Sequence, residues 1–111
     1  MLLLALILFS IAILLGFYLL SFVLQNKNTP KGIAFIHGPI AAFGLIILIV
    51  YAIVHSPKPL LSILLLTLAA IGGLVLISLD LMGKTIPKIF AIGHGLIALL
   101  GFFLLVLFTY A

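Results

Sequence analysis

Two histidines of this chain, His37 and His94, lie in the same local sequence 57 residues apart. Residues 30–44 read PKGIAFIHGPIAAFG, and residues 87–101 read PKIFAIGHGLIALLG. In both copies a Pro-Lys pair comes first, the histidine stands six residues after the lysine, and a glycine follows the histidine directly. The surrounding stretch is otherwise apolar. An ionisable side chain in such a stretch is costly to place in a membrane and indicates a functional site. The pair is therefore the first candidate for chemistry.

The composition predicts that these histidines lie in an integral membrane protein whose partner is the lipid bilayer. The chain has 111 residues, of which 68% are hydrophobic and 5% are charged, against about 25% charged in soluble domains. Four apolar stretches each exceed the roughly 20 residues that cross a bilayer core. They are residues 2–24, 33–54, 60–82 and 88–110. We expect an all-α bundle of four transmembrane helices in a single membrane domain, residues 1–111.

The sequence is a tandem duplication with a 57-residue period. Residues 3–54 align with residues 60–111 without a gap and share 18 identities in 52 pairs. The rarer shared residues include Ala12/Ala69, Gly16/Gly73 and Ser21/Ser78. Each repeat is a two-helix hairpin that crosses twice, so both copies keep one orientation, and their pseudo-twofold axis should follow the membrane normal.

Helical phase predicts which side of the second and fourth helices faces inward. The shared residues fall on one stripe of each helix. They are Ala34, His37, Ala41, Gly44 and Leu48, with their mates Ala91, His94, Ala98, Gly101 and Leu105. The residues between them differ between the copies and should face lipid. The Ala-x-x-x-Gly pairs of the first and third helices permit close helix approach.

Two equivalent imidazoles at equal depth are the ligand set of an axially coordinated haem, so His37 and His94 are the predicted metal ligands of one non-covalent haem b. We expect Ala41, Gly44, Ala98 and Gly101 to leave room for the macrocycle. Lys31 and Lys88 lie six residues before the histidines and could pair with the haem propionates. A pair of structural histidines bonded to neighbouring carbonyls or hydroxyls is the alternative.

Other chemistries fit the residues less well. The chain has no cysteine and one acidic residue, Asp80, so no catalytic residue set is predicted and whether the protein is an enzyme stays open. A zinc site with four ligands would need a homodimer.

The remaining polar residues are expected to have local roles. Asp80 lies four residues before Lys84, which predicts a local ion pair. His55 is expected in a solvated turn, while Ser21 and Ser78 could hold the histidines or bond their own helix. Thr29 is expected to cap the second helix, with Pro30 as its first residue.

The lysines predict the orientation of the bundle and its membrane. The net charge of +4 would suggest nucleic acid in a soluble protein, but here the lysines fall in turns, where lipid headgroups explain them and no nucleic acid is expected. The first and third turns carry Lys27, Lys31, Lys84 and Lys88, and the second carries Lys58. The positive-inside rule places the first and third turns in the cytoplasm and both termini outside. We expect a bacterial inner-membrane protein.

In its four-helix plan, with His37 and His94 on different helices, the chain resembles the small transmembrane cytochromes b. The resemblance implies one b-type haem and electron transfer, with a quinone or another redox partner. Cytochromes b of this kind with two haems carry a second histidine pair, and the first and third predicted helices of this chain contain no histidine. The chain also resembles small multidrug-resistance transporters in length, but their acidic residue in the first helix is missing. Haem carriage or sensing, or a cofactor-free transporter or stabilising subunit of a larger complex, are the other functions considered.

Overall fold

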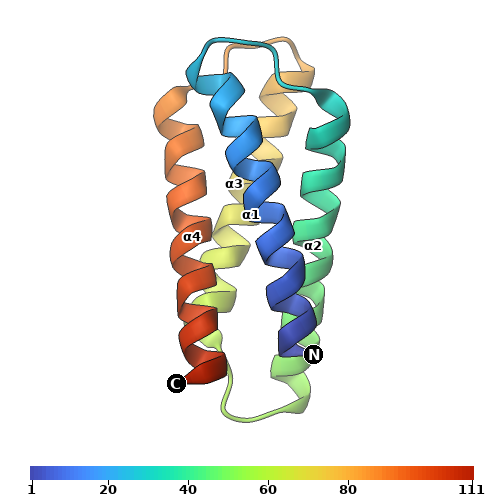
Figure 1. Ribbon diagram of the computed structural model, residues 1–111, viewed down its shortest axis with the longest axis vertical. Coiled ribbons are helices and arrows are strands. Elements are labelled where there is room, and N and C mark those ends of the chain that lie inside the picture. The colour runs from blue at the N-terminus through green and yellow to red at the C-terminus, as the bar shows by residue number, and fades with distance from the viewer.

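The computed structural model, which describes all 111 residues, consists of four helices and no strands (Figure 1). The helices are α1 (Leu2–Leu24), α2 (Lys31–Val54), α3 (Leu60–Leu81) and α4 (Lys88–Tyr110). All four are long and apolar enough to cross a membrane. The bounds agree with the predicted ones to within two residues.

The helices form a bundle built from two consecutive hairpins. α1 packs on α2 and α3 packs on α4, while α1–α4 and α2–α3 are the two edges at which the hairpins meet. Helices α2 and α4 therefore face each other across the bundle diagonal. Both termini and the 55–59 turn lie at one end, with the two other turns at the opposite end (Figure 1). The longest dimension is 43 Å, enough to span a hydrocarbon core of about 30 Å. The all-α architecture of two tandem hairpins is confirmed.

The two turns at the end away from the termini repeat each other in backbone detail. Asn26 and Gly83 are repeat mates, and both have positive φ, at 56° and 72°. The next amide in each turn, that of Lys27 or Lys84, bonds a carbonyl five residues earlier. This is the Schellman arrangement, in which a left-handed residue ends the helix and satisfies its last carbonyls. Asparagine is among the few side chains that adopt this conformation readily.

Burial follows the repeat and confirms the inward stripe. The two fully buried large side chains, Leu48 and Leu105, are mates. Mates of α1 and α3 are buried together as well, among them Ala12 and Ala69. The outer surface consists of apolar side chains such as Ile53 and Ile89, which are 75% and 87% exposed. A soluble monomer rarely carries so continuous an apolar surface, whereas lipid tails cover it at no cost.

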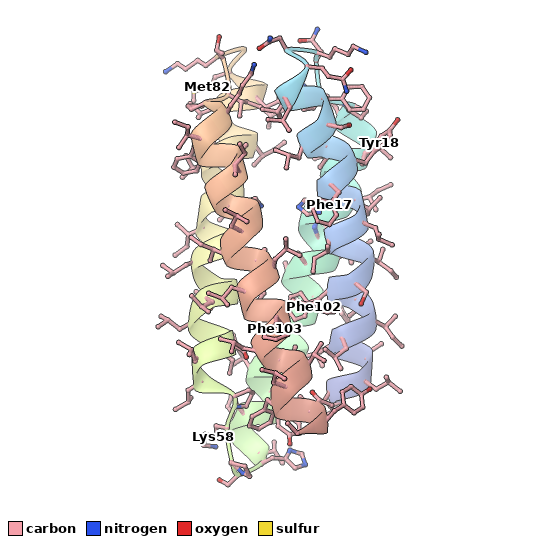
Figure 2. All side chains as sticks on the ribbon, turned by 60° about the vertical axis from the view of Figure 1, so that its left-hand side comes forward. Phe17, Tyr18, Lys58, Met82, Phe102 and Phe103 are labelled. Atoms are coloured by element: carbon pink, nitrogen blue, oxygen red, sulfur yellow. The ribbon has the colours of Figure 1, made fainter.

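The larger core side chains gather in the half of the bundle that holds the termini. The cluster there contains Ala5, Leu6, Phe9, Leu48, Leu66 and Leu105. In Figure 2 the label Lys58 marks this end of the bundle and the label Met82 marks the opposite end. Phe102 and Phe103 lie nearer to Lys58. Lys58 donates to the carbonyls of Ala52 and His55, which satisfies the exposed end of α2. In the histidine half, the buried apolar residues are three alanines, Ala12, Ala69 and Ala91.

The prediction that Thr29 caps α2 is wrong. Pro30 occupies the cap position, the helix begins at Lys31, and no side chain bonds the free amides there. The Thr29 hydroxyl instead donates to the Asp80 carboxylate at the end of α3. A hydrogen bond to a charged carboxylate is stronger than one between a hydroxyl and a backbone amide. The Thr29 hydroxyl therefore bonds Asp80 and does not cap its own helix. Pro39 lies within a continuous α2 on an exposed face.

Candidate functional site

His37 and His94 meet inside the bundle from opposite corners. Each lies six residues after the first residue of its helix, α2 or α4, which is roughly 9 Å along the axis. Their ring centroids are 6.5 Å apart and the ring planes are inclined at 85°. The structure thus brings together the two residues that the sequence singled out, at equal depth.

The ring of His37 is oriented by the neighbouring helix. Its Nδ1 lies 2.8 Å from the Ala12 carbonyl oxygen in α1. A carbonyl oxygen only accepts, so Nδ1 donates its proton and Nε2 keeps a free lone pair. Histidines that ligate metals are commonly held in this way by a carbonyl or carboxylate on the second nitrogen. The Ala12 carbonyl therefore fixes His37 in the tautomer that leaves Nε2 as the unprotonated nitrogen.

His94 occupies the equivalent place with one difference. The Ala69 carbonyl, mate of Ala12, lies beside its ring. The His94 Nδ1 is nevertheless fully covered and has no partner within hydrogen-bonding geometry. A buried polar atom without a partner is costly and uncommon. The two histidines thus face equivalent backbone carbonyls, and only His37 meets full hydrogen-bonding geometry.

Glycines of α1 and α3 seat the two imidazoles. A Cβ atom at Gly16 would lie 3.1 Å from Cε1 of His37, and one at Gly73 would lie 3.2 Å from Cε1 of His94. Gly72 also borders His94, at 3.4 Å from its Nδ1. The sequence marked Gly16 and Gly73 as shared small residues for helix packing. Sequence reasoning did not predict that the imidazole rings of His37 and His94 fill the space beside these two glycines.

The small residues that follow the histidines along α2 and α4 form two pairs, Ala41 with Ala98 and Gly44 with Gly101. Gly44 and Gly101 are buried two turns further along their helices. A Cβ atom there would lie 3.3 Å from the Phe9 ring and 2.9 Å from Leu66 Cγ. These glycines therefore receive core side chains of α1 and α3.

Ala41 and Ala98, one turn from the histidines, are only half-buried. The closely packed core begins one turn further along, at Gly44 and Gly101.

The two lysines predicted to meet propionates differ in their surroundings. Lys31 Nζ lies 2.8 Å from Asp80 Oδ2, in the only ion pair of the structure. The expected local pair of Asp80 with Lys84 is therefore wrong, because the start of α2 presents both Lys31 and Thr29 to the carboxylate. Lys88 is exposed and makes no ion pair.

The remaining polar residues stay outside the site. Ser21 and Ser78 bond carbonyls of their own helices, those of Tyr18 and Leu74, so they do not hold the imidazoles. His55 is exposed, as predicted for a solvated turn. Its ring stacks on Tyr51 with the centroids 4.4 Å apart.

The donor set at the centre of the bundle is limited to two nitrogens. No group of three or more His, Cys, Asp or Glu side chains comes close enough to hold a metal ion. No protein-family model, curated protein or solved structure matches this chain significantly. The chemistry of the two histidines therefore has to be argued from their geometry.

Proposed function

We propose that the protein binds one b-type haem between α2 and α4, with His37 and His94 as its axial ligands. The observation that carries this proposal is the matched approach of the two rings, whose centroids are 6.5 Å apart. Two imidazoles on opposite sides of one metal, each bonded at about 2 Å, have centroids roughly 6 Å apart. The observed spacing is close to this value and would suit one shared iron atom once both Nε2 atoms, which lie beside Gly16 and Gly73, turn toward each other.

The number of protein ligands supports haem over a bare metal ion. Zinc and similar ions in proteins are usually held by three or four side chains, and only two are present here. A metal held by this pair has to bring its other ligands with it. A porphyrin supplies four nitrogens in a plane and leaves two axial positions for imidazoles.

The groups beside the pair also support the proposal. Ala41 and Ala98, one turn from the histidines, are small and half-buried, and the Ala12 carbonyl holds the ring of His37. The unpartnered Nδ1 of His94 would gain the Ala69 carbonyl by a small ring rotation. Bound haem would supply one-electron redox chemistry. With both axial positions taken by histidine, electron transfer is the favoured role, with a quinone or another membrane redox partner, ahead of haem carriage or sensing.

Titration with hemin tests this proposal. We expect the detergent-purified protein to bind one hemin per chain and to give the sharp reduced bands of a six-coordinate low-spin haem. The measurement is the absorption spectrum in the oxidised and dithionite-reduced states at increasing hemin. A protein that stays colourless and takes up no hemin would refute it and favour a cofactor-free transporter or stabilising subunit.

The charge distribution supports a definite orientation in a bacterial inner membrane. Four of the five lysines lie at the histidine end of the bundle, and only Lys58 lies at the end with both termini. The positive-inside rule then places the histidines toward the cytoplasmic leaflet. Reporter fusions at Ala111 and within residues 25–30 check this, with a periplasmic signal expected at Ala111. A cytoplasmic signal at Ala111 would reverse the orientation and leave the haem proposal intact.

A further inference from the structure

The duplicated halves of the bundle differ in one polar contact at the histidine end. The mate of Asp80 is Val23, and the mate of Thr29 is Ile86. The α2–α3 edge therefore carries an ion pair that the equivalent α1–α4 edge lacks. Lys31 and Lys88 are repeat mates, but Lys31 is paired with an acid and Lys88 is not.

Lys31 is held in place on several sides. Its Nζ donates to Asp80 Oδ2 at 2.8 Å, to Thr29 Oγ1 at 3.1 Å and to the Thr29 carbonyl at 3.2 Å. The Asp80 side chain is only 15% exposed and Thr29 is buried. Taking Lys31 away would leave a largely buried carboxylate without its cation, which is strongly unfavourable.

We propose that Asp80 makes the two lysines unequal, so that Lys88 alone is the cation that binds a haem carboxylate at this end of the bundle. This inference rests on the proposed haem site. A propionate that approached Lys31 would have to displace Asp80 and would meet its negative charge. A propionate at the α1–α4 edge meets Val23, which carries no charge, and Lys88, which has no other partner.

The same asymmetry selects an edge of the bundle for the polar side of the haem. The Asp80 contact joins α2 to α3, whereas no hydrogen bond or ion pair between side chains joins α1 to α4. The propionate side of the haem therefore lies toward α4. Lys84, in the loop before α4, is also exposed but lies outside the helix that carries His94, and it provides the control.

Hemin affinity in lysine variants tests this inference. Because an exposed ion pair is worth up to about 1 kcal/mol, Lys88→Ala should weaken hemin binding about fivefold. The spectrum should stay six-coordinate low-spin, since both histidines are present. Lys84→Ala removes the same charge from the adjacent loop and should bind as the wild type does. Hemin dimethyl ester, which lacks the carboxylates, should bind equally to the wild type and to Lys88→Ala.

Exchanging the asymmetric residue gives a second test. Val23→Asp places an acid opposite Lys88 and should weaken hemin binding as Lys88→Ala does. Asp80→Val frees Lys31 and should restore affinity in the Lys88→Ala background. Thermal unfolding of each variant without hemin reports whether the bundle is intact.

The outcomes separate this inference from the proposed function. Wild-type protein that binds no hemin would overturn both. Wild-type protein that binds hemin as tightly as Lys88→Ala does would overturn only the role of Lys88.

Discussion

Replacing either His37 or His94 with alanine is expected to abolish six-coordinate haem binding. Each variant keeps one axial ligand, and nothing else in the interior can replace the other, because no further His, Cys, Asp or Glu lies close. Hemin affinity should fall by at least about tenfold, which corresponds to 1.4 kcal/mol. Any hemin that still binds should give the broad spectrum of a five-coordinate iron. The double variant should bind no hemin specifically.

His55→Ala is the matched control for the histidine variants. It removes an imidazole that is exposed at the opposite end of the bundle and should leave the spectrum and the affinity unchanged. A single variant of His37 or His94 that retained the wild-type spectrum would move the ligand to another residue. Loss of the spectrum in His55→Ala would place the haem between copies of the chain.

Substituting Gly16 or Gly73 with valine is expected to remove haem binding without removing a ligand. A Cβ at either position would lie 3.1 Å or 3.2 Å from the imidazole it faces, and the added methyl groups have to displace that ring. Overpacking of this kind costs about 1–3 kcal/mol. We expect hemin affinity to fall about tenfold or more, measured by titration, with a lower midpoint of thermal unfolding.

Gly38→Val and Gly95→Val are the controls for glycine replacement in a helix. Both glycines adjoin a histidine in sequence, and a Cβ at either meets no atom within 4 Å. Their hemin affinity should equal that of the wild type. If the Gly16 and Gly73 variants bound hemin as these controls do, the imidazoles would not depend on their glycine seats.

Much of the fold could be predicted from the sequence because one physical signal is repeated. Membrane-spanning length alone sets the four helices. The shared stripe of Ala34, His37 and Leu48 recurs 57 residues later, and only the inward face of a duplicated hairpin is under the same constraint in both copies. The equal depth of the two histidines follows from that register.

The contacts made by individual side chains could not be predicted in the same way. Asp80 pairs with Lys31 across the two hairpins, although Lys84 is nearer in sequence. The choice depends on how the start of α2 sits against the end of α3, which no spacing along the chain encodes. The same holds for Phe9, which packs against Gly44. The sequence marked that glycine as small but did not identify the side chain that takes its space.

The alternative of a histidine bonded to a neighbouring carbonyl holds for His37, but the sequence could not identify the Ala12 carbonyl as the acceptor of its N–H. Sequence patterns mark side chains and give no sign of which backbone carbonyl faces inward. The nearby serines were the visible candidates, and both bond their own helices instead. Only the packing of α1 on α2 brings the carbonyl to the ring.

The electron paramagnetic resonance spectrum of the oxidised hemin complex tests most directly whether His37 and His94 ligate one iron. We expect a low-spin ferric signal, because two imidazoles form a strong axial field. A high-spin ferric signal from wild-type protein saturated with hemin would show that the two histidines do not share the iron, and would contradict the account.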